Sequence, residues 1–354
     1  HKTPLSNWKK LFRAVITMTM TATSNHIFVS LVVLIVALLA SQFFFRLNKT
    51  THEWHEGPKW QRFLSIYDDR ILQEYPDCDS RLLPTRFGST QVHACGDSTK
   101  PAVLMLHGAG SNSLIYGDWL IPTIRLTHYA VAVDFICDAG RSVPKEKNVS
   151  NCPQSQQELA DWISDVVSGL KILSNKVSII GYSYGSFIAA CTAMYKPNLV
   201  NKAVFIAPAA VFAPIQVSWI FRAVVYAMFP SYLYNWFFKY MSADPDFEYS
   251  KMSPRHQDLT SAIREVAETT LAVNAESFSD EKLLAMTSNT KTMLIIGELE
   301  TVVNSTVAVD TARRVGVSKV ELYPKAGHLL LMEYPREPIK SLIASFLESS
   351  ENSS

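Results

Sequence analysis

The stretch "IIGYSYGSFIAA", residues 179–190, runs β-branched apolar residues directly into a Gly-Tyr-Ser-Tyr-Gly bend and then into helix-forming residues. This change predicts a strand that ends near the bend, a serine at its tip (Ser183), and a helix that begins near Tyr184. The glycines allow strained backbone there, and the helix amide dipoles point at the serine. A G-x-S-x-G pattern arises by chance on the order of 0.1 times in a chain of this size, so its weight depends on the remaining sequence.

Length and composition limit the possible classes of protein. The chain has 354 residues, of which 48% are hydrophobic, so it can bury a large core in one big domain with appendages or in two smaller domains. The net charge of +1 and the lack of a basic stripe with interleaved aromatics argue against a nucleic-acid partner. No Cys/His spacing resembles a zinc site, so no metal is predicted.

Short, continuous apolar runs recur along the chain, and helical patterns separate them. Runs of this kind are typical of strands buried on both faces of a parallel sheet. The clearest helix starts at the capping box Ser155-x-x-Glu158. The sequence therefore predicts an α/β fold with a mostly parallel central sheet and flanking helices. The predicted strands are 101–106, 129–135, 176–180, 202–207, 291–296 and 319–323.

The first part of the chain differs from the rest. Residues 27–45, "IFVSLVVLIVALLASQFFF", carry no charge and would form a helix of about 28 Å, close to the thickness of a bilayer core. We expect a transmembrane signal anchor at 27–47 rather than a cleaved signal peptide or a core helix. The bias of positive charges weakly favours a cytosolic N-terminus and a lumenal or extracellular catalytic domain. The charges before the span are Lys2, Lys9, Lys10 and Arg13, and those after it are Arg46 and Lys49.

These features divide the chain into an N-terminal tail, the span, a membrane-proximal segment and a catalytic domain. The boundaries are 1–26, 27–47, 48–84 for a linker with a helix, and 85–350 for the domain. A hairpin with Gly88-Ser89 at its tip is expected to open the domain. A long aromatic insertion at about 209–288 predicts a helical cap. Its aromatics form the core of the cap, line an apolar pocket or touch the bilayer.

The five cysteines fit a lumenal location but do not prove it. Cys191 lies on the helix after the bend and is expected to be buried. The other four pair most plausibly as Cys78/Cys95 and Cys137/Cys152, with free thiols an equal alternative. Four sequons for N-glycosylation, at Asn48, Asn148, Asn304 and Asn352, would be usable in the same compartment.

A nucleophilic serine needs a base, and His328 in "YPKAGHLLLMEYP" is the candidate. It follows the last predicted strand, beyond a small Ala-Gly turn and before an apolar run. His107 also follows a predicted strand, but its place before Gly108-Ala109-Gly110 suits the shaping of a loop.

The base needs a carboxylate to orient it, and "LIIGELETVVN" supplies Glu300 and Glu298. Glu300 lies far enough past Gly297 for the chain to turn back over the sheet, so we prefer it. Asp134 and Asp138 are rival carboxylates, but both precede Ser183 in the chain. The usual order is serine, then carboxylate, then histidine. The oxyanion donors are expected to be the backbone N–H groups of Ala109, in the small-residue loop "LMLHGAGSNS", and of Tyr184. A Gly-rich phosphate loop is disfavoured because neither GK[ST] nor G-x-G-x-x-G follows.

The order Ser183, Glu300, His328 resembles that of the α/β-hydrolase superfamily. Residues 85–350 carry its motifs in order: "HGAG" at the oxyanion loop, "GYSYG" at the nucleophile, "GELETVV" at the acid and "AGHLLLMEYP" at the histidine. The Glu in the acid loop, together with "APAAVFAP" before an aromatic cap, is similar to the bacterial carboxylesterase-like branch. The membrane span departs from those mostly soluble enzymes.

The resemblance implies a serine hydrolase that needs no cofactor or metal. Ser183 would attack an acyl carbonyl, His328 would accept its proton, Glu300 would hold the imidazole, and Ala109 and Tyr184 would bind the oxyanion. The expected substrate is a carboxylic ester with an apolar part, and lipid esters of the monoacylglycerol type and thioesters remain open. A serine nucleophile argues against the epoxide hydrolase and dehalogenase branches. The alternative from another class is a non-catalytic, hydrolase-like binding protein.

Overall fold

The computed structural model describes residues 54–349 except 175, 267–272 and 334–335. Contacts divide the chain into two units, His1–Asn48 and Lys49–Ser354. The predicted transmembrane span at 27–47 lies outside the described residues. Within the part of the chain that is described, no helix combines the length and apolar character that crossing a membrane requires.

A nine-stranded sheet forms the centre of the second unit, in the order β1-β2-β4-β3-β6-β7-β8-β9, with β5 paired to β2. The strands from β4 to β9 along this path are parallel, and β1 and β2 join antiparallel at one edge. Strands β3, β4 and β6 are buried along their whole length, as their uninterrupted apolar runs predict. The bounds are β1 Cys78–Thr85, β2 Gly88–Cys95, β3 Ala102–Leu106, β4 Tyr129–Val133, β5 Val143–Pro144, β6 Val177–Tyr182, β7 Val200–Ile206, β8 Lys291–Gly297 and β9 Lys319–Tyr323.

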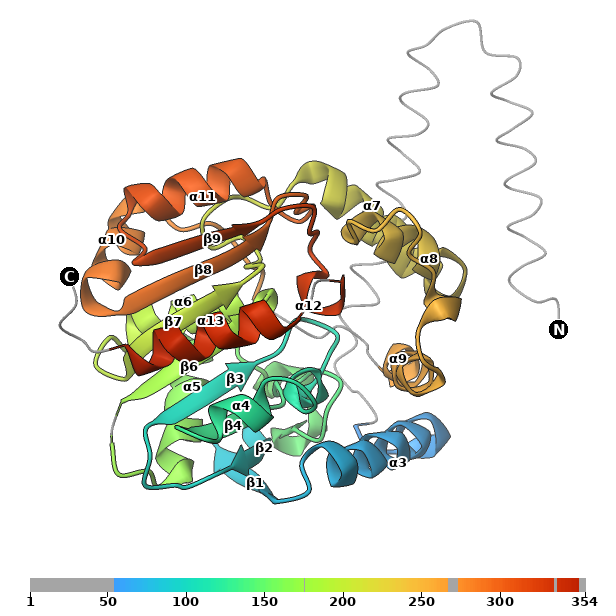
Figure 1. Ribbon diagram of the computed structural model, residues 1–354. Coiled ribbons are helices and arrows are strands. Elements are labelled where there is room, and N and C mark those ends of the chain that lie inside the picture. Colours follow the sequence, from blue (N-terminus) through green and yellow to red (C-terminus); the bar gives the residue numbers. More distant parts are fainter. Residues whose placement is uncertain (1–53, 175, 267–272, 334–335, 350–354) are drawn as a thin grey trace, which may run out of the picture. The chain divides into compact units, whose positions relative to one another are not determined.

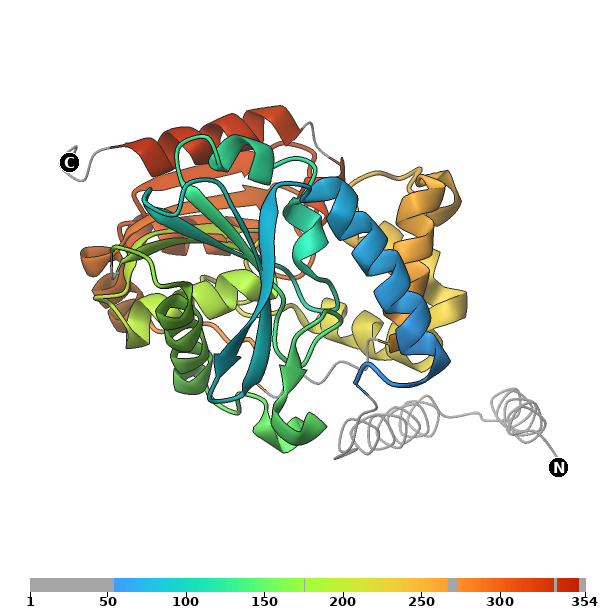
Figure 2. The same cartoon turned by 90° about the horizontal axis from the view of Figure 1, so that it is seen from below.

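Helices cover both faces of the sheet, so the predicted α/β class is confirmed. Helices α4 (Ile121–Ile124) and α13 (Arg336–Glu348) lie on one face, and α5 (Gln156–Leu170) and α6 (Tyr184–Tyr195) lie on the other (Figures 1 and 2). Helix α11 (Ser305–Arg314) packs on β8 and β9. One half of the predicted capping box forms, because the Ser155 hydroxyl accepts the N–H of Glu158. The Glu158 carboxylate accepts the N–H of Gln154, the residue before the N-cap, at 2.6 Å.

Among the described residues, the cap contains the α-helices α7 (Val217–Met228), α8 (Pro230–Met241) and α9 (Pro254–Val266) beside the sheet (Figure 1). It is smaller than the predicted 209–288. Helix α10 (Asp280–Asn289) contacts α6 and β8 and so belongs to the layer that covers the sheet. Helix α3 (Gly57–Glu74), the helix expected before the domain, packs against α9 (Figure 2).

The edge hairpin differs from the prediction in two respects. Its first strand begins at Cys78, so the sheet starts before the expected domain boundary at 85. Its tip is Arg86-Phe87, and Gly88 is already the first residue of β2. The reason is a close approach: a Cβ on Gly88 would lie 2.2 Å from the carbonyl oxygen of Val143 in β5, so the glycine serves strand packing as well as the turn.

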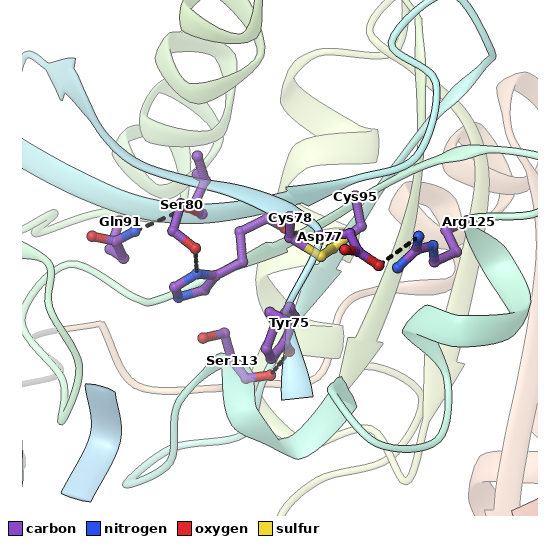
Figure 3. Close-up of a disulfide and its surroundings, with 10 residues drawn as sticks. Tyr75, Asp77, Cys78, Ser80, Gln91, Cys95, Ser113 and Arg125 are labelled. Carbon is purple, nitrogen blue, oxygen red and sulfur yellow. Dashed lines mark hydrogen bonds and ion pairs between the residues drawn. A yellow bond between two sulfur atoms is a disulfide. The ribbon is translucent and has the colours of Figure 1, made fainter. Parts of the chain in front are cut away.

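Both predicted disulfides are present. Cys78 and Cys95 are register partners on β1 and β2 and form one bridge (Figure 3), and Cys137 and Cys152 form the other. Cys191 is a free, buried thiol, as expected. The first bridge closes the antiparallel edge of the sheet, and the second ties the loop after β4 to the residues just before α5.

Candidate active site

Ser183 lies between β6 and α6, at the predicted sharp bend. Its backbone has φ 53° and ψ −115°, a strained conformation for a residue with a side chain. The two glycines are required by close packing. A Cβ on Gly181 would lie 2.4 Å from the carbonyl oxygen of Gly185, and a Cβ on Gly185 would lie 2.1 Å from that of Leu106. The backbone therefore has the sharp strand-to-helix turn that a nucleophile elbow requires.

His328 and Glu300 come from loops after different strands and meet Ser183 at the carboxyl end of the sheet. His328 Nε2 lies 3.0 Å from Ser183 Oγ, and His328 Nδ1 lies 2.9 Å from each carboxylate oxygen of Glu300. Because a carboxylate only accepts, the ring proton sits on Nδ1, and Nε2 is left free to accept from the serine hydroxyl. The three side chains therefore form one directed chain of hydrogen bonds.

The two glutamates of the acid loop have different environments. Glu300 is 7% exposed, and its Oε1 also accepts the N–H of Val302 at 2.7 Å, which fixes the carboxylate under the imidazole. Glu298 is exposed and accepts the N–H of Lys325 at 3.1 Å. The structure thus brings Glu300, the preferred residue, to His328.

The small-residue loop lies directly against the elbow. A Cβ on Gly108 would lie 3.2 Å from Ser183 Cβ and 3.3 Å from the Tyr182 ring. Tyr184 is the first residue of α6, so its amide is one of those without an acceptor in its own helix. Ala109, the other predicted donor, follows Gly108 in this loop. The predicted oxyanion residues therefore come from the two segments that flank the serine.

His107 ties this loop to the chain after β4. The N–H of Phe135 donates to His107 Nε2 at 2.9 Å, so the proton is on Nδ1, which donates to the Gly108 carbonyl oxygen at 2.7 Å. The ring also stacks on Phe135 with centroids 3.8 Å apart. Burial lowers the pKa of His107 from 6.5 to about 4. These contacts suit the loop-shaping role expected for His107.

The pKa of His107 makes a prediction about stability. Between pH 6.5 and about 4, His107 binds a proton in the unfolded chain but stays neutral in the native protein. Acid therefore lowers the free energy of unfolding over this range, by up to about 3 kcal/mol. A His107→Gln variant lacks this loss. We therefore expect its deficit in the free energy of unfolding, measured by urea titration, to shrink as the pH falls from 7 to 4. A deficit that does not change with pH would contradict a neutral His107.

Two contacts of the site have no signal in the sequence. The backbone N–H of His328 donates to the carbonyl oxygen of Met241, the last residue of cap helix α8, at 2.9 Å. The Tyr182 hydroxyl donates to the His328 carbonyl oxygen at 3.0 Å. The histidine is therefore positioned by the cap and by the elbow as well as by its own loop.

The rival carboxylates have other partners. Asp134 accepts from the Tyr67 hydroxyl at 2.8 Å and from the N–H of Ser113 at 2.9 Å. Asp138 accepts from the N–H of Gly110 at 2.9 Å. Both carboxylates thus bind backbone in and beside the small-residue loop that contains Ala109. Glu300 is the carboxylate that contacts the imidazole of His328.

Comparisons with known proteins agree with this geometry. Residues 103–340 match the model of the "Alpha/beta hydrolase family". The chain is 26% identical to an uncharacterized carboxylesterase, nap, of Bacillus subtilis over 77% of this chain and 88% of that protein. The crystal structure of carboxylesterase CesB (YbfK) from Bacillus subtilis superposes with a TM-score of 0.71 at 24% identity, over 82% of this chain and 98% of that one.

The crystal structure of naproxen esterase from the same organism gives a TM-score of 0.69 at 24% identity, over 83% of this chain and 99% of that one. These relatives confirm the resemblance to the carboxylesterase-like branch and, with it, the expectation of a carboxylesterase-like enzyme. The family match spans the elbow, the acid loop and the histidine, the three segments that meet at Ser183. The chain belongs to the alpha/beta hydrolase family.

Proposed function

We propose that this protein is a serine hydrolase that cleaves a carboxylic ester through an acyl-enzyme. The observation that carries the proposal is the hydrogen-bonded chain from Ser183 Oγ through His328 to Glu300. A non-catalytic binding protein would have no need of a strained serine aligned with a base and a buried carboxylate. The carboxylesterase relatives support the same chemistry.

The proposed reaction has two steps. Ser183 Oγ attacks the ester carbonyl carbon while His328 Nε2 takes its proton, and Nε2 returns that proton to the departing alcohol. Water then attacks the acyl-enzyme, gives a proton to Nε2, and the acid leaves as Ser183 regains its proton. Glu300 stabilises the imidazolium, and the Ala109 and Tyr184 amides bind the oxyanion, with each donor lowering the barrier by about 3–4 kcal/mol.

The cap supports a substrate with an apolar part. Leu329, directly after His328, packs in a cluster with Phe237 and Met241 of α8. Trp219 and Tyr226 of α7 pack against that cluster. The buried apolar cluster of the cap therefore extends to the residue next to the proposed base.

The test combines labelling with a substrate series. We expect a fluorophosphonate to label the intact protein and p-nitrophenyl esters to be hydrolysed, with kcat/KM rising as the acyl chain lengthens from acetyl. The kcat/KM values for monoacylglycerols and for acyl thioesters, measured in the same panel, rank these two alternative substrate classes. Ligand binding without product, and no labelling of folded protein, would instead identify a binding protein.

We further propose that residues 27–47 anchor the chain in a membrane and that the catalytic domain faces a lumen or the exterior. The two disulfides support an oxidising compartment. The sequon at Asn304 is exposed at the start of α11. In a eukaryotic host we expect carbonate-resistant membrane association and a glycan that Asn304→Gln removes. Release of the protein by carbonate would contradict the anchor.

A further inference from the structure

Two loops beside the nucleophile are joined along their length. The first is the oxyanion loop, residues 107–113, and the second is the loop after β4, residues 134–142. Each loop contributes side chains that bind the backbone of the other. The four bonds are Phe135 N–H to His107 Nε2 at 2.9 Å, Gly110 N–H to Asp138 Oδ2 at 2.9 Å, Asn112 Nδ2 to the Ala139 carbonyl oxygen at 3.1 Å, and Ser113 N–H to Asp134 Oδ1 at 2.9 Å.

Asp138 makes the contact closest to the predicted oxyanion donor. Its carboxylate is 6% exposed and takes the N–H of Gly110 on Oδ2 and that of Ala139 on Oδ1, at 2.9 and 2.7 Å. Gly110 has φ 67° and directly follows Ala109. The carboxylate thus fixes the peptide that follows Ala109. Burial raises the pKa of Asp138 to about 7.

A disulfide holds Asp138 in turn. Cys137, the preceding residue, is bonded to Cys152 and has φ 73°, a conformation rarely adopted by a residue with a side chain. Cys152 follows the short helix Val149–Asn151 and precedes the Ser155 cap of α5. The bridge therefore connects the loop after β4 to a helix that is packed on the sheet.

We propose that Asp138, held by the Cys137–Cys152 disulfide, is a positioning residue that sets the oxyanion loop in its catalytic geometry. The proposal rests on the proposed function, since it concerns the donor at Ala109. Oxyanion donors lower the barrier only when they already point at the site of developing charge. A loop of small residues such as Gly108 and Gly110 has many other conformations, and the carboxylate selects one of them.

The first test is substitution of Asp138. Asp138→Asn replaces one acceptor oxygen by an NH₂ donor, so either Gly110 or Ala139 loses its acceptor, and Asp138→Ala removes both. We expect kcat on a p-nitrophenyl ester to fall about 10- to 100-fold in Asp138→Asn and further in Asp138→Ala, with KM changed less than about threefold.

An inhibitor that mimics the tetrahedral state separates positioning from general destabilisation. An alkyl trifluoromethyl ketone adds to a serine and places an oxyanion in the donor site. Its affinity should fall with kcat in the Asp138 variants while KM stays near that of the wild type. Asp97→Asn is the matched control. Asp97 also accepts a backbone N–H, that of Thr99 at 2.9 Å, but it lies in the turn between β2 and β3, before the strand that leads into the oxyanion loop.

The second test uses the two disulfides as a matched pair. They close loops of similar length, with sequence separations of 15 for Cys137–Cys152 and 17 for Cys78–Cys95, so their removal has similar effects on the unfolded chain. We expect the Cys137→Ser/Cys152→Ser variant to lose kcat about 10-fold at a temperature where it is folded by circular dichroism. The Cys78→Ser/Cys95→Ser variant should keep kcat and lose only thermal stability.

The outcomes separate this proposal from the proposed function. If the wild type neither hydrolyses esters nor reacts with a fluorophosphonate, the proposed function is wrong. If the wild type is active but folded Asp138 variants keep its kcat and its affinity for the ketone, the positioning role is refuted. Equal losses of kcat in the two disulfide variants would also refute it, because the effect would then be one of stability alone.

Discussion

Replacing Ser183 with alanine should reduce kcat/KM for ester hydrolysis by about 10⁴- to 10⁶-fold and abolish labelling by a fluorophosphonate. The substitution removes the atom that forms the acyl-enzyme, and the imidazole and oxyanion donors cannot act on an acyl group that is never bound to the protein. The strained backbone at Ser183, with φ 53°, is imposed by its neighbours, so we expect the alanine variant to fold. Steady-state kinetics and gel-based labelling measure the two effects.

A neighbouring serine provides the control for this experiment. Ser178 lies in β6, the strand that leads to Ser183, and is buried. Ser178→Ala should keep both hydrolysis and labelling. If folded Ser183→Ala retained even a hundredth of the wild-type rate, the nucleophile would have to be another group.

Replacing Glu300 with glutamine should lower kcat by about 10³- to 10⁴-fold with little change in KM. A glutamine can keep the bond to the Val302 N–H through its oxygen, but its NH₂ group then faces His328 Nδ1. The imidazole responds by moving its proton to Nε2, where it can no longer accept from Ser183. The loss therefore appears in the chemical step, and the kcat and KM values report it separately.

Glu298 is the matched control, because it has the same side chain in the same loop. It is exposed, and its carboxylate accepts the backbone N–H of Lys325. We expect Glu298→Gln to retain activity within about twofold. Equal losses in the Glu298 and Glu300 variants would mean that the loop, rather than the carboxylate at His328, is what matters.

The central sheet could be predicted because its signals are local. The apolar runs of β3, β4 and β6 have no polar face. Amphipathic helices between such runs can bury them by covering both faces of a parallel sheet. The elbow was predictable for a similar reason. Only glycine fits at residues 181 and 185, where backbone atoms would lie within 2.4 Å of a Cβ.

The hairpin tip and the extent of the cap were harder to predict because non-local contacts decide them. Gly88 indicated a turn, yet its close approach to β5 places it in a strand. The sequence places most of α10 in the cap because no predicted strand lies between Ala207 and Lys291, but α10 packs on α6 and β8. In both cases, contacts with segments distant in the sequence decide the structure, and the local sequence pattern does not indicate them.

The sequence by itself determined the residue types and their order: a serine at a forced bend, a carboxylate and a histidine after later strands, and cysteines close enough to pair. Such features depend on neighbours in the chain. Only the tertiary structure decided that the Asp138 carboxylate binds the N–H of Gly110 and that the Met241 carbonyl oxygen of the cap binds the N–H of His328. These contacts join segments far apart in sequence through backbone N–H groups, which every residue but proline carries, so no residue type marks them in advance.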